Sequence, residues 1–198
     1  MNLKNMSYED KEKLANNPYT PEDVLRALAQ DENGGVRWEV AENPSTPLDI
    51  LRDLAQDESW GVRGSVAENP STPVEVLRDL AKDGSPWVRW RMAKNPSTPI
   101  DVLREMAKDE NGGVKRNVAR NSSTPLDLLR ALAKDENWGV RASVAEHPKA
   151  SSKLLVMLFE YEKSLREPDE DVIKALYANE KLPHIAKVII ETLFGEML

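Results

Sequence analysis

The sequence contains no cysteine, and it has only two histidines and two phenylalanines among its 198 residues. Without cysteine the chain has no disulfide bond, no thiolate ligand for zinc or an iron–sulfur cluster, and no cysteine nucleophile. Neither His147 nor His184 belongs to a metal-binding spacing such as His-Glu-x-x-His, and no glycine loop carries the motif that cradles phosphate. We therefore predict no catalytic residue, no metal site, no cofactor and no enzymatic activity.

Long apolar runs are also absent. A membrane-spanning helix needs about 18 or more apolar residues in a row, and no stretch of this sequence approaches that length. The amino-terminal residues 1–14 mix acids and bases and contain no apolar core like that of a signal peptide. The composition, 40% hydrophobic and 31% charged, is typical of a folded protein. We expect a cytoplasmic protein with no membrane partner.

One pentapeptide recurs along the chain at a fixed interval. Asn-Pro-Ser-Thr-Pro begins at Asn43, Asn69 and Asn95, and variants of it begin at Asn17 and Asn121, so that successive starts are 26 residues apart. Five copies in register are a specific sign of an architecture in which similar units stack on one another.

The pentapeptides divide the sequence into three parts. Residues 1–16 are predicted to form an amino-terminal cap or half repeat. Five repeats follow over 17–146, with the bounds 17–42, 43–68, 69–94, 95–120 and 121–146. Residues 147–198 are predicted to hold a degenerate sixth repeat and a carboxy-terminal helical cap.

The degenerate part retains some marks of the repeat. Val172 and Asn179 are spaced like Val36 and Asn43, which indicates a partial seventh unit. The sixth unit is then 32 residues long. We expect its additional length near residues 161–168.

Each repeat begins with a predicted helix. In the second copy, Thr46 suits an N-cap and Pro47 suits the first helical position. Asp49 lies three residues after the cap, as the acidic residue of a capping box does. The residues after them place their apolar side chains in one stripe of helical spacing, namely Ile50, Leu51, Leu54 and Ala55.

A second and shorter helical segment is predicted to begin near Val62. It would present Val62, Val66 and Ala67 to the core and end before Asn69, because a residue that precedes proline is disfavoured in the α conformation. No stretch alternates polar and apolar residues long enough to indicate a strand. Neither helix can bury its stripe alone, so the pattern predicts an all-α solenoid of two helical layers without a sheet.

The repeat resembles the leucine-rich repeat variant (LRV) family, and its architecture is similar to that of HEAT-type helical repeats. The family string Val-Arg-x-x-Val-Ala-x-Asn-Pro-x-Thr-Pro, continued by Leu-x-x-Leu-Ala-x-Asp, stands nearly complete from Val36 to Asp57. The resemblance covers about residues 10–146 well. It implies a right-handed superhelix in which α-helices alternate with short 3₁₀-type helices. One family member carries an iron–sulfur module held by cysteines, which this sequence lacks, so we carry over no redox role.

Three charged positions are present in every repeat. A catalytic group is needed once, whereas a group present in every copy is expected to serve stacking. We therefore expect the aspartates to accept hydrogen bonds from loop amides or to pair with arginines of the same or the next repeat. The three series are Arg26, Arg52, Arg78, Arg104 and Arg130; Asp31, Asp57, Asp83, Asp109 and Asp135; and Arg37, Arg63, Arg89, Lys115 and Arg141.

Other positions differ between copies that are otherwise alike. Tryptophan, glycine, arginine and alanine cannot fill the same hole in a core, so we expect these variable positions on the surface, together along the second helix. All five tryptophans occupy them. The positions are Gly34-Gly35, Trp60-Gly61, Pro86-Trp87, Gly112-Gly113 and Trp138-Gly139; Trp38-Glu39, Gly64-Ser65, Trp90-Arg91, Arg116-Asn117 and Ala142-Ser143; and Glu42, Glu68, Lys94, Arg120 and Glu146.

The middle repeats combine tryptophan with basic residues. Repeat 69–94 has five basic and three acidic residues, whereas repeat 17–42 has two basic and six acidic residues. Tryptophan and arginine are enriched at binding hot spots, although the same residues can simply cover loops and stack on neighbouring arginines. The predicted binding residues are Trp60, Trp87, Arg89, Trp90, Arg91, Lys94, Lys115, Arg116, Arg120 and Trp138.

Two functions fit these residues. The first is a non-enzymatic scaffold that binds a protein or peptide through the variable positions. The alternative is a nucleic-acid-binding module that uses the same basic and aromatic residues. The formal net charge of −7 favours the protein partner. An enzymatic role would rest on likeness of architecture alone.

The last residues, 182–198, are unusually apolar around most of a predicted helix. We interpret this segment as a cap over the end of the core. Because a cap is expected to have a polar outer face, a homodimer interface is the alternative.

Overall fold

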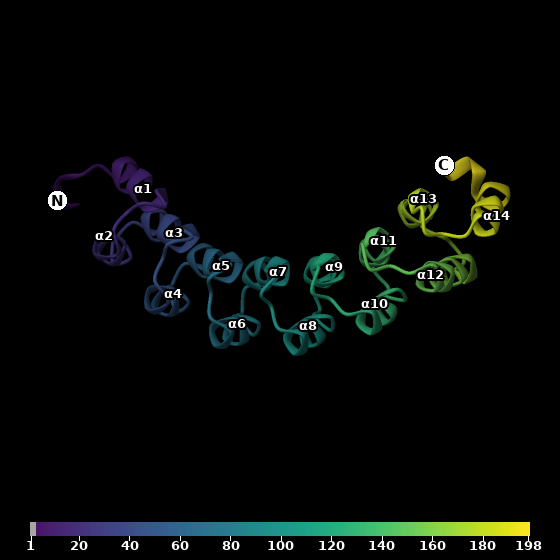
Figure 1. Cartoon of the computed structure of the whole chain (residues 1–198), viewed down its shortest axis with the longest axis horizontal. Helices are drawn as coiled ribbons and strands as arrows, with labels where there is room; N and C mark the ends of the chain where they lie inside the picture. Colours follow the sequence, from purple (N-terminus) through teal and green to yellow (C-terminus); the bar gives the residue numbers. More distant parts are fainter. Residues whose placement is uncertain (1–2) are drawn as a thin grey trace. The chain divides into compact units, whose positions relative to one another are not determined.

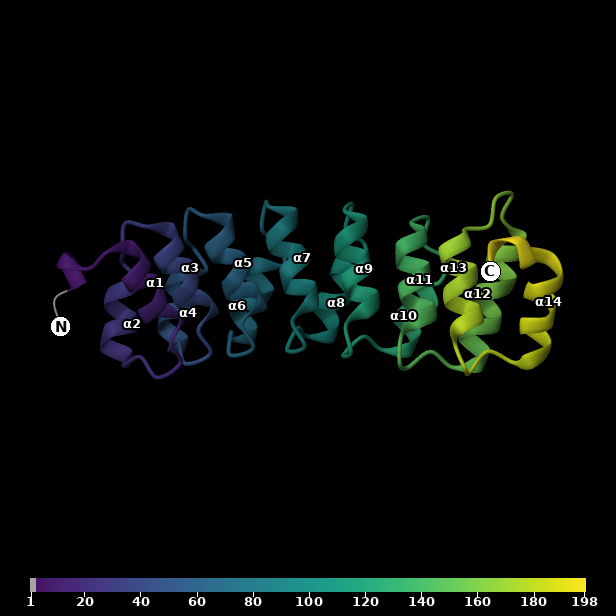
Figure 2. The same cartoon turned by 90° about the horizontal axis from the view of Figure 1, so that it is seen from above.

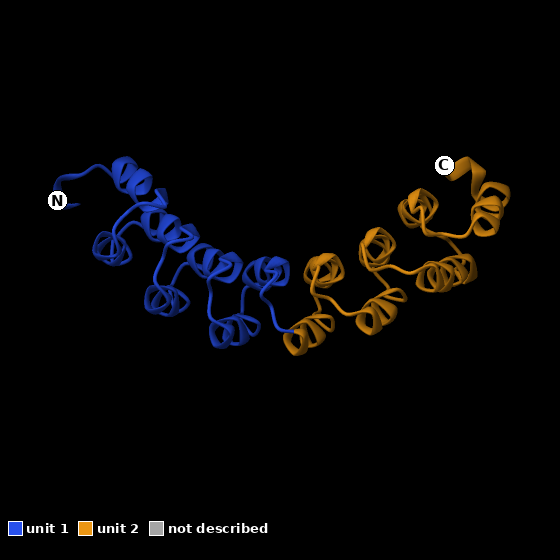
Figure 3. Ribbon diagram, in the orientation of Figure 1, with its two compact units in different colours: residues 1–99 blue, residues 100–198 orange. Residues whose placement is uncertain are grey.

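The computed structural model describes residues 3–198, which form fourteen α-helices and two 3₁₀ helices and contain no strand. The chain divides into two compact units, Met1–Pro99 and Ile100–Leu198 (Figure 3). Helices of successive repeats pair in two layers (Figure 1), so the predicted all-α solenoid without a sheet is confirmed.

Unit 1 contains seven α-helices in alternating layers (Figures 1 and 2). The second helices of successive repeats pack directly on one another, and we call them the second-helix layer: α1 (Tyr8–Asn16), α3 (Gly34–Glu42), α5 (Trp60–Glu68) and α7 (Pro86–Lys94). The first-helix layer holds α2 (Glu22–Leu28), α4 (Leu48–Leu54) and α6 (Val74–Leu80). The 3₁₀ helix η1 (Leu3–Asn5) precedes them.

Unit 2 repeats this arrangement. Its second-helix layer consists of α9 (Gly112–Arg120), α11 (Trp138–Glu146) and α13 (Glu170–Ala178). Its first-helix layer consists of α8 (Ile100–Met106), α10 (Leu126–Leu132) and α12 (Ser152–Ser164). Helix α14 (His184–Phe194) packs on α13, and η2 (Gly195–Met197) follows it.

The core lies between the two layers and is built from the residues predicted for it. Ile50, Leu51, Leu54 and Ala55 are buried on the first helix of the second repeat, as are Val62, Val66 and Ala67 on its second helix. Full burial of one such aliphatic side chain contributes about 1.5–3 kcal/mol. The repeating apolar stripe therefore supplies the main stabilisation of each helix pair.

The predicted cap of the first helix is wrong. Pro47 rather than Thr46 is the N-cap of α4, and no side chain caps this helix. Thr46 is buried, and its hydroxyl donates a hydrogen bond of 2.5 Å to the carbonyl oxygen of Val40 in the preceding helix. A buried hydroxyl needs a partner, and the neighbouring helix end supplies one. Thr20, Thr72, Thr98 and Thr124 make the same contact in their repeats.

The second helix differs from its prediction in length and type. It is α-helical and nine residues long, whereas the first helix has seven residues. It is therefore not the shorter helix, nor the 3₁₀ helix that the family resemblance implies. In α3 the Asn33 side chain accepts a hydrogen bond from the Gly35 amide at 2.7 Å, which starts the helix two residues before Val36. The variable pairs that begin with Gly34, Trp60 and Pro86 thus belong to a first helical turn and not to a loop.

Three of the pentapeptide asparagines, Asn43, Asn69 and Asn95, tie neighbouring parts of the array together. The Asn69 amide donates to the carbonyl oxygens of Ala41 at 2.8 Å and Asn43 at 3.1 Å, and its own oxygen accepts from the Ser71 amide. Asn43 and Asn95 make the corresponding contacts. These three asparagines are buried. Each therefore donates hydrogen bonds to backbone carbonyls at the end of the preceding second helix.

Histidine takes this place at the start of the sixth repeat. His147 is buried; its Nε2 lies 3.2 Å from the carbonyl oxygen of Asn121, and its Nδ1 accepts from the Lys149 amide at 3.0 Å. A neutral imidazole with its proton on Nε2 therefore reproduces both roles of the asparagine. The predicted seventh copy is equivalent as well, because Asn179 donates to the carbonyl oxygen of Ala145.

The additional residues of the sixth repeat lengthen a helix. Helix α12 has thirteen residues where other first helices have seven, and residues 165–169 connect it to α13. At its end Glu162 is fully buried and pairs with Arg141. The predicted domain limits at 16/17 and 146/147 stay a prediction, while the boundary between the compact units follows Pro99.

Only one side of helix α14 packs against the rest of the unit. Ala186 and Ile190 are buried, whereas Ile185, Val188 and Leu193 are exposed. The cap and the homodimer interface predicted for residues 182–198 both remain predictions.

Replacement of Asn69 by alanine should lower the free energy of unfolding by about 3 kcal/mol, because the Ala41 carbonyl and the Ser71 amide lose their partner and the Asn43 carbonyl keeps only its bond from the Thr46 amide. Urea denaturation followed by circular dichroism measures this loss. Asn69→His should retain much of the stability, since His147 already performs the same role. Equal stability of Asn69→Ala and the wild type would contradict the role of the asparagine.

His147 should make the stability of unit 2 depend on pH. Burial lowers the pKa of its imidazole from the ordinary value of 6.5, so the unfolded chain takes up the proton first. Stability should therefore be full above about pH 7.5 and fall as the pH drops through about 6.5 towards the folded-state pKa. Denaturation series of the wild type and His147→Asn should diverge in this window, with the variant less sensitive. Parallel curves would argue against this coupling.

Candidate binding surface

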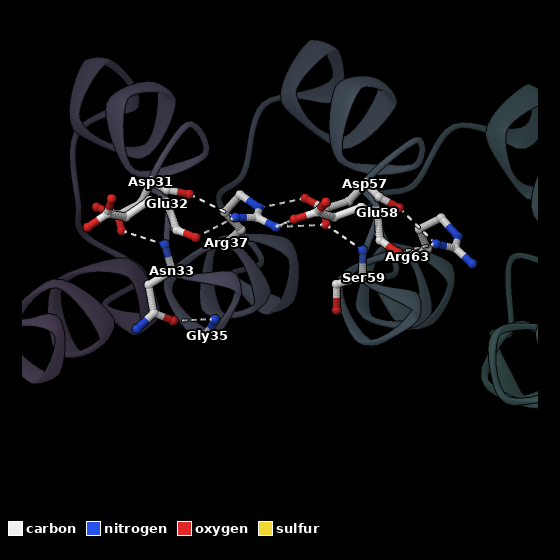
Figure 4. Close-up of polar contacts among 9 residues, drawn as sticks. All are labelled: Asp31, Glu32, Asn33, Gly35, Arg37, Asp57, Glu58, Ser59 and Arg63. Atoms are coloured by element: carbon white, nitrogen blue, oxygen red, sulfur yellow. Dashed lines mark hydrogen bonds and ion pairs between the residues drawn. The ribbon is translucent and has the colours of Figure 1, made fainter.

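The invariant charges form a ladder that joins neighbouring repeats (Figure 4). Arg37 donates from Nε and Nη2 to the Asp57 carboxylate at 2.6 and 3.0 Å, and its Nη1 donates to the carbonyl oxygens of Asp31 and Glu32. Arg63 repeats these contacts with Asp83. The predicted pairing of aspartate with the arginine of a neighbouring repeat is confirmed for these residues.

The aspartates are held in the ionised form. Burial acts to raise the pKa of Asp57, but the hydrogen bonds from Arg37 and from the Ser59 amide outweigh it and bring the pKa below its ordinary value. Asp83 has the same balance of causes. Both carboxylates therefore serve as ionised partners in the contacts between repeats.

Two of the predicted binding residues belong to this ladder. Lys115 is buried, and its ammonium lies 2.8 Å from the Asp135 carboxylate. Arg89 donates from Nη1 to the carbonyl oxygen of Asp83, as Arg63 does to Asp57. The structure thus places Lys115 in the ladder, and it gives Arg89 the carbonyl contact that the ladder arginines make.

Three tryptophans gather on the second-helix layer of unit 1. The rings of Trp60 and Trp87 stack with centroids 6.4 Å apart, and Trp90 meets Trp87 edge-on at 5.9 Å. Lys94 places its ammonium 5.0 Å from the centre of the Trp90 ring. Trp60 and Trp87 are 54% and 59% exposed, so this cluster presents aromatic surface to its surroundings.

The charges beside the tryptophan cluster are mixed. Arg91 donates to Glu68 at 3.0 Å and to Glu42 at 3.3 Å, and Lys94 pairs with Glu68 at 2.5 Å. The two predicted basic residues therefore lie among carboxylates. The surface has both signs of charge and is not a positive patch.

The expectation that every variable position lies on the surface is wrong for the small residues. A Cβ atom on Gly64 would lie 2.9 Å from Cδ of Arg91, which belongs to the next repeat and covers it. Where one copy has a small residue, a long side chain of a neighbouring copy fills the space. The buried variable residues are Gly64, Ser65, Asn117, Gly139, Ala142 and Ser143.

Unit 2 has its own surface feature, an open hollow of about 440 Å³ across α9, α11 and α13. The predicted residues Arg116, Arg120 and Trp138 line it. Asp171 and Lys174 of α13 line it too, and the sequence reasoning missed them because the seventh copy is too degenerate to compare. Trp138 is 44% exposed.

The predicted residues are thus divided between separate surfaces. Unit 1 brings together Trp60, Trp87, Trp90, Arg91 and Lys94. Unit 2 brings together Arg116, Arg120 and Trp138. Over residues 3–198, no group of histidine, aspartate and glutamate side chains has a geometry that could hold a metal ion. None of the helices in that range is long and apolar enough to cross a membrane.

Replacement of Asp57 by alanine tests the structural role of the ladder. The change leaves the Arg37 guanidinium buried without its carboxylate, and we expect the free energy of unfolding to fall by about 3 kcal/mol. Arg26→Ala removes one partner of an exposed pair, Arg26–Asp49, and should change stability little. Thermal and urea denaturation compare the two variants. A similar effect of both would contradict the distinction between ladder and surface charges.

No family model matches the sequence, and no curated protein matches it. Among solved structures it is similar to one described as a leucine-rich repeat variant with a novel repetitive protein structural motif, with a TM-score of 0.63 and 31% sequence identity. The match covers 89% of this chain and 68% of that one. The chain therefore belongs to the leucine-rich repeat variant family.

Proposed function

We propose that this chain is a non-enzymatic repeat scaffold that binds a protein partner through its second-helix layers. The observation that carries the proposal is the tryptophan cluster of Trp60, Trp87 and Trp90, which keeps more than half of two indole rings exposed. Large aromatic side chains in contact with one another lose little conformational freedom on binding and are frequent hot spots.

The position of the cluster supports the same proposal. The polar residues that are the same in every copy form contacts between repeats. The tryptophans lie at the positions of the second helices that vary between copies. Variation between copies at surface positions gives each part of a repeat array its own contact chemistry. The membership in a repeat family is consistent with a scaffold.

A protein partner fits the charges better than nucleic acid does. Phosphate groups would meet Glu42 and Glu68 beside Arg91 and Lys94, and both cations already pair with these carboxylates. Nucleic-acid binding relies on neutralisation of phosphates by unpaired cations. A protein surface can instead match aromatic side chains and alternating charges together.

A matched pair of double variants tests the proposal. Trp60→Ala/Trp87→Ala removes the exposed rings, and Leu48→Ala/Val74→Ala removes exposed apolar side chains from the first-helix layer of the same unit. Both should keep the wild-type melting temperature, because the replaced side chains are exposed. In affinity purification with quantitative mass spectrometry, the tryptophan variant should lose specific partners at least tenfold, and the control should retain them.

Retention of the same partners by the tryptophan variant would exclude this surface. Fluorescence anisotropy with single- and double-stranded oligonucleotides provides the second arm. We expect no binding even at low salt. Tight binding that falls steeply as salt rises would favour the nucleic-acid function instead.

A further inference from the structure

The hollow of unit 2 contains an arginine whose hydrogen-bonding groups are not used by the fold. Arg116 forms no hydrogen bond or ion pair with any residue in the described range 3–198, and its Nε is buried without a partner. Its stem lies over α11, where a Cβ atom on Gly139 would be 3.5 Å from Cδ of Arg116. The close packing of its stem holds the guanidinium at the hollow.

Unit 1 supplies a direct comparison for this arginine. Arg91 also lies over a glycine, Gly64, but its guanidinium donates to Glu42 and Glu68. An N–H group that is buried without an acceptor destabilises the protein. The two arginines have similar packing, and only Arg116 lacks the acceptors. A bound acceptor would supply what Arg116 lacks.

The charges of the other residues in the hollow indicate which kind of acceptor fits there. The other cations are matched, because Arg120 lies 3.6 Å from Glu146 and Lys174 lies 2.6 Å from Glu170. Asp171 adds a further negative charge to the lining. A ligand with several phosphates would therefore be repelled by two carboxylates, Glu146 and Asp171, and attracted by only one unpaired guanidinium, that of Arg116. A single carboxylate carries one negative charge, which Arg116 can balance, and therefore meets less repulsion.

Apolar surface lies beside the guanidinium. The exposed indole of Trp138 borders the hollow, and the small side chains of Ala142, Ala175 and Ala178 also line it. An apolar side chain can pack there next to a charged one. The volume of about 440 Å³ is in the range of pockets that enclose a small ligand or a few side chains.

We propose that this hollow binds a peptide segment of a protein partner through an aspartate or glutamate side chain. The carboxylate accepts from the two Nη groups of Arg116 in a bidentate pair, and an adjacent apolar side chain of the segment packs against Trp138. The inference rests on the proposed function, since it names the chemistry of a protein partner on a second-helix layer. It adds a site separate from the tryptophan cluster of unit 1.

The test uses a phage-displayed library of random dodecapeptides selected on the full chain, after depletion of the library on an Arg116→Met variant. Methionine keeps an unbranched stem over Gly139 and removes the guanidinium, so the fold should be retained with an unchanged melting temperature. Arg91→Met is the matched control. It removes an arginine that is similarly packed but already paired.

We expect the selected peptides to share an acidic residue next to an apolar one. Replacement of that residue by glutamine or asparagine should weaken binding at least tenfold, and so should Arg116→Met, whereas Arg91→Met should not. In a ¹⁵N–¹H spectrum of the chain, the peptide should shift the indole signal of Trp138 and leave that of Trp60 unchanged. Arg116→Lys should bind less well than the wild type, because an ammonium cannot form the bidentate pair.

Two results would overturn the inference. One is that no peptide distinguishes the wild type from Arg116→Met, and the other is that the distinguishing peptides need no carboxylate. Neither result affects the partner purification with Trp60→Ala/Trp87→Ala. Conversely, that purification can fail while acidic peptides still bind at Arg116, so the two proposals fail separately.

Discussion

The structure depends on the satisfaction of backbone groups at the end of each second helix by the next repeat. A helix leaves its last carbonyls without internal partners, and burial of such groups is costly. Asn69, which ends α5, meets this requirement for Ala41 and Asn43 at the end of α3. At the other end of the same two helices, Arg37 of α3 forms its bidentate pair with Asp57, which precedes α5. A repeat in isolation would expose its apolar stripe and also leave these polar groups unpaired. Stacking is therefore the condition for each helix pair to fold.

This constraint explains which residues are the same in every copy. The asparagine, the threonine and the ladder charges each have partners in an adjacent helix or repeat, so their positions are fixed by the geometry of stacking. The substitutions that do occur keep the contact. His147 replaces an asparagine and retains two of its three hydrogen bonds, and Lys115 replaces an arginine and still reaches Asp135. In the lengthened sixth repeat, Glu162 reaches Arg141 from the end of α12.

The same constraint leaves the remaining positions of the second helices open to variation. There a large side chain of one repeat can extend over a small residue of its neighbour, as Arg91 does over Gly64 and Arg116 over Gly139. Whether such an arginine is available to a ligand depends on the carboxylates around it. Glu42 and Glu68 occupy Arg91, whereas the surroundings of Arg116 supply no acceptor to its Nε. The tryptophan cluster of unit 1 and the hollow of unit 2 both arise at the variable positions of the second helices. They differ in the side chains that those positions carry.

The sequence by itself determined the repeat, the two-layer all-α architecture and the core, because the spacing of Leu51, Leu54, Val62 and Val66 allows one mode of burial. It also determined that the recurrent charges are structural, since a residue present in every copy points to stacking. The tertiary structure decided that Thr46 binds the preceding helix instead of capping its own, and that Gly64 and Ala142 are covered. It also decided that Arg91 is paired and Arg116 is not. These outcomes depend on contacts between residues far apart in the chain, such as Arg91 and Glu42 at a separation of 49 residues. Propensity and periodicity describe only near neighbours, so they could not decide them.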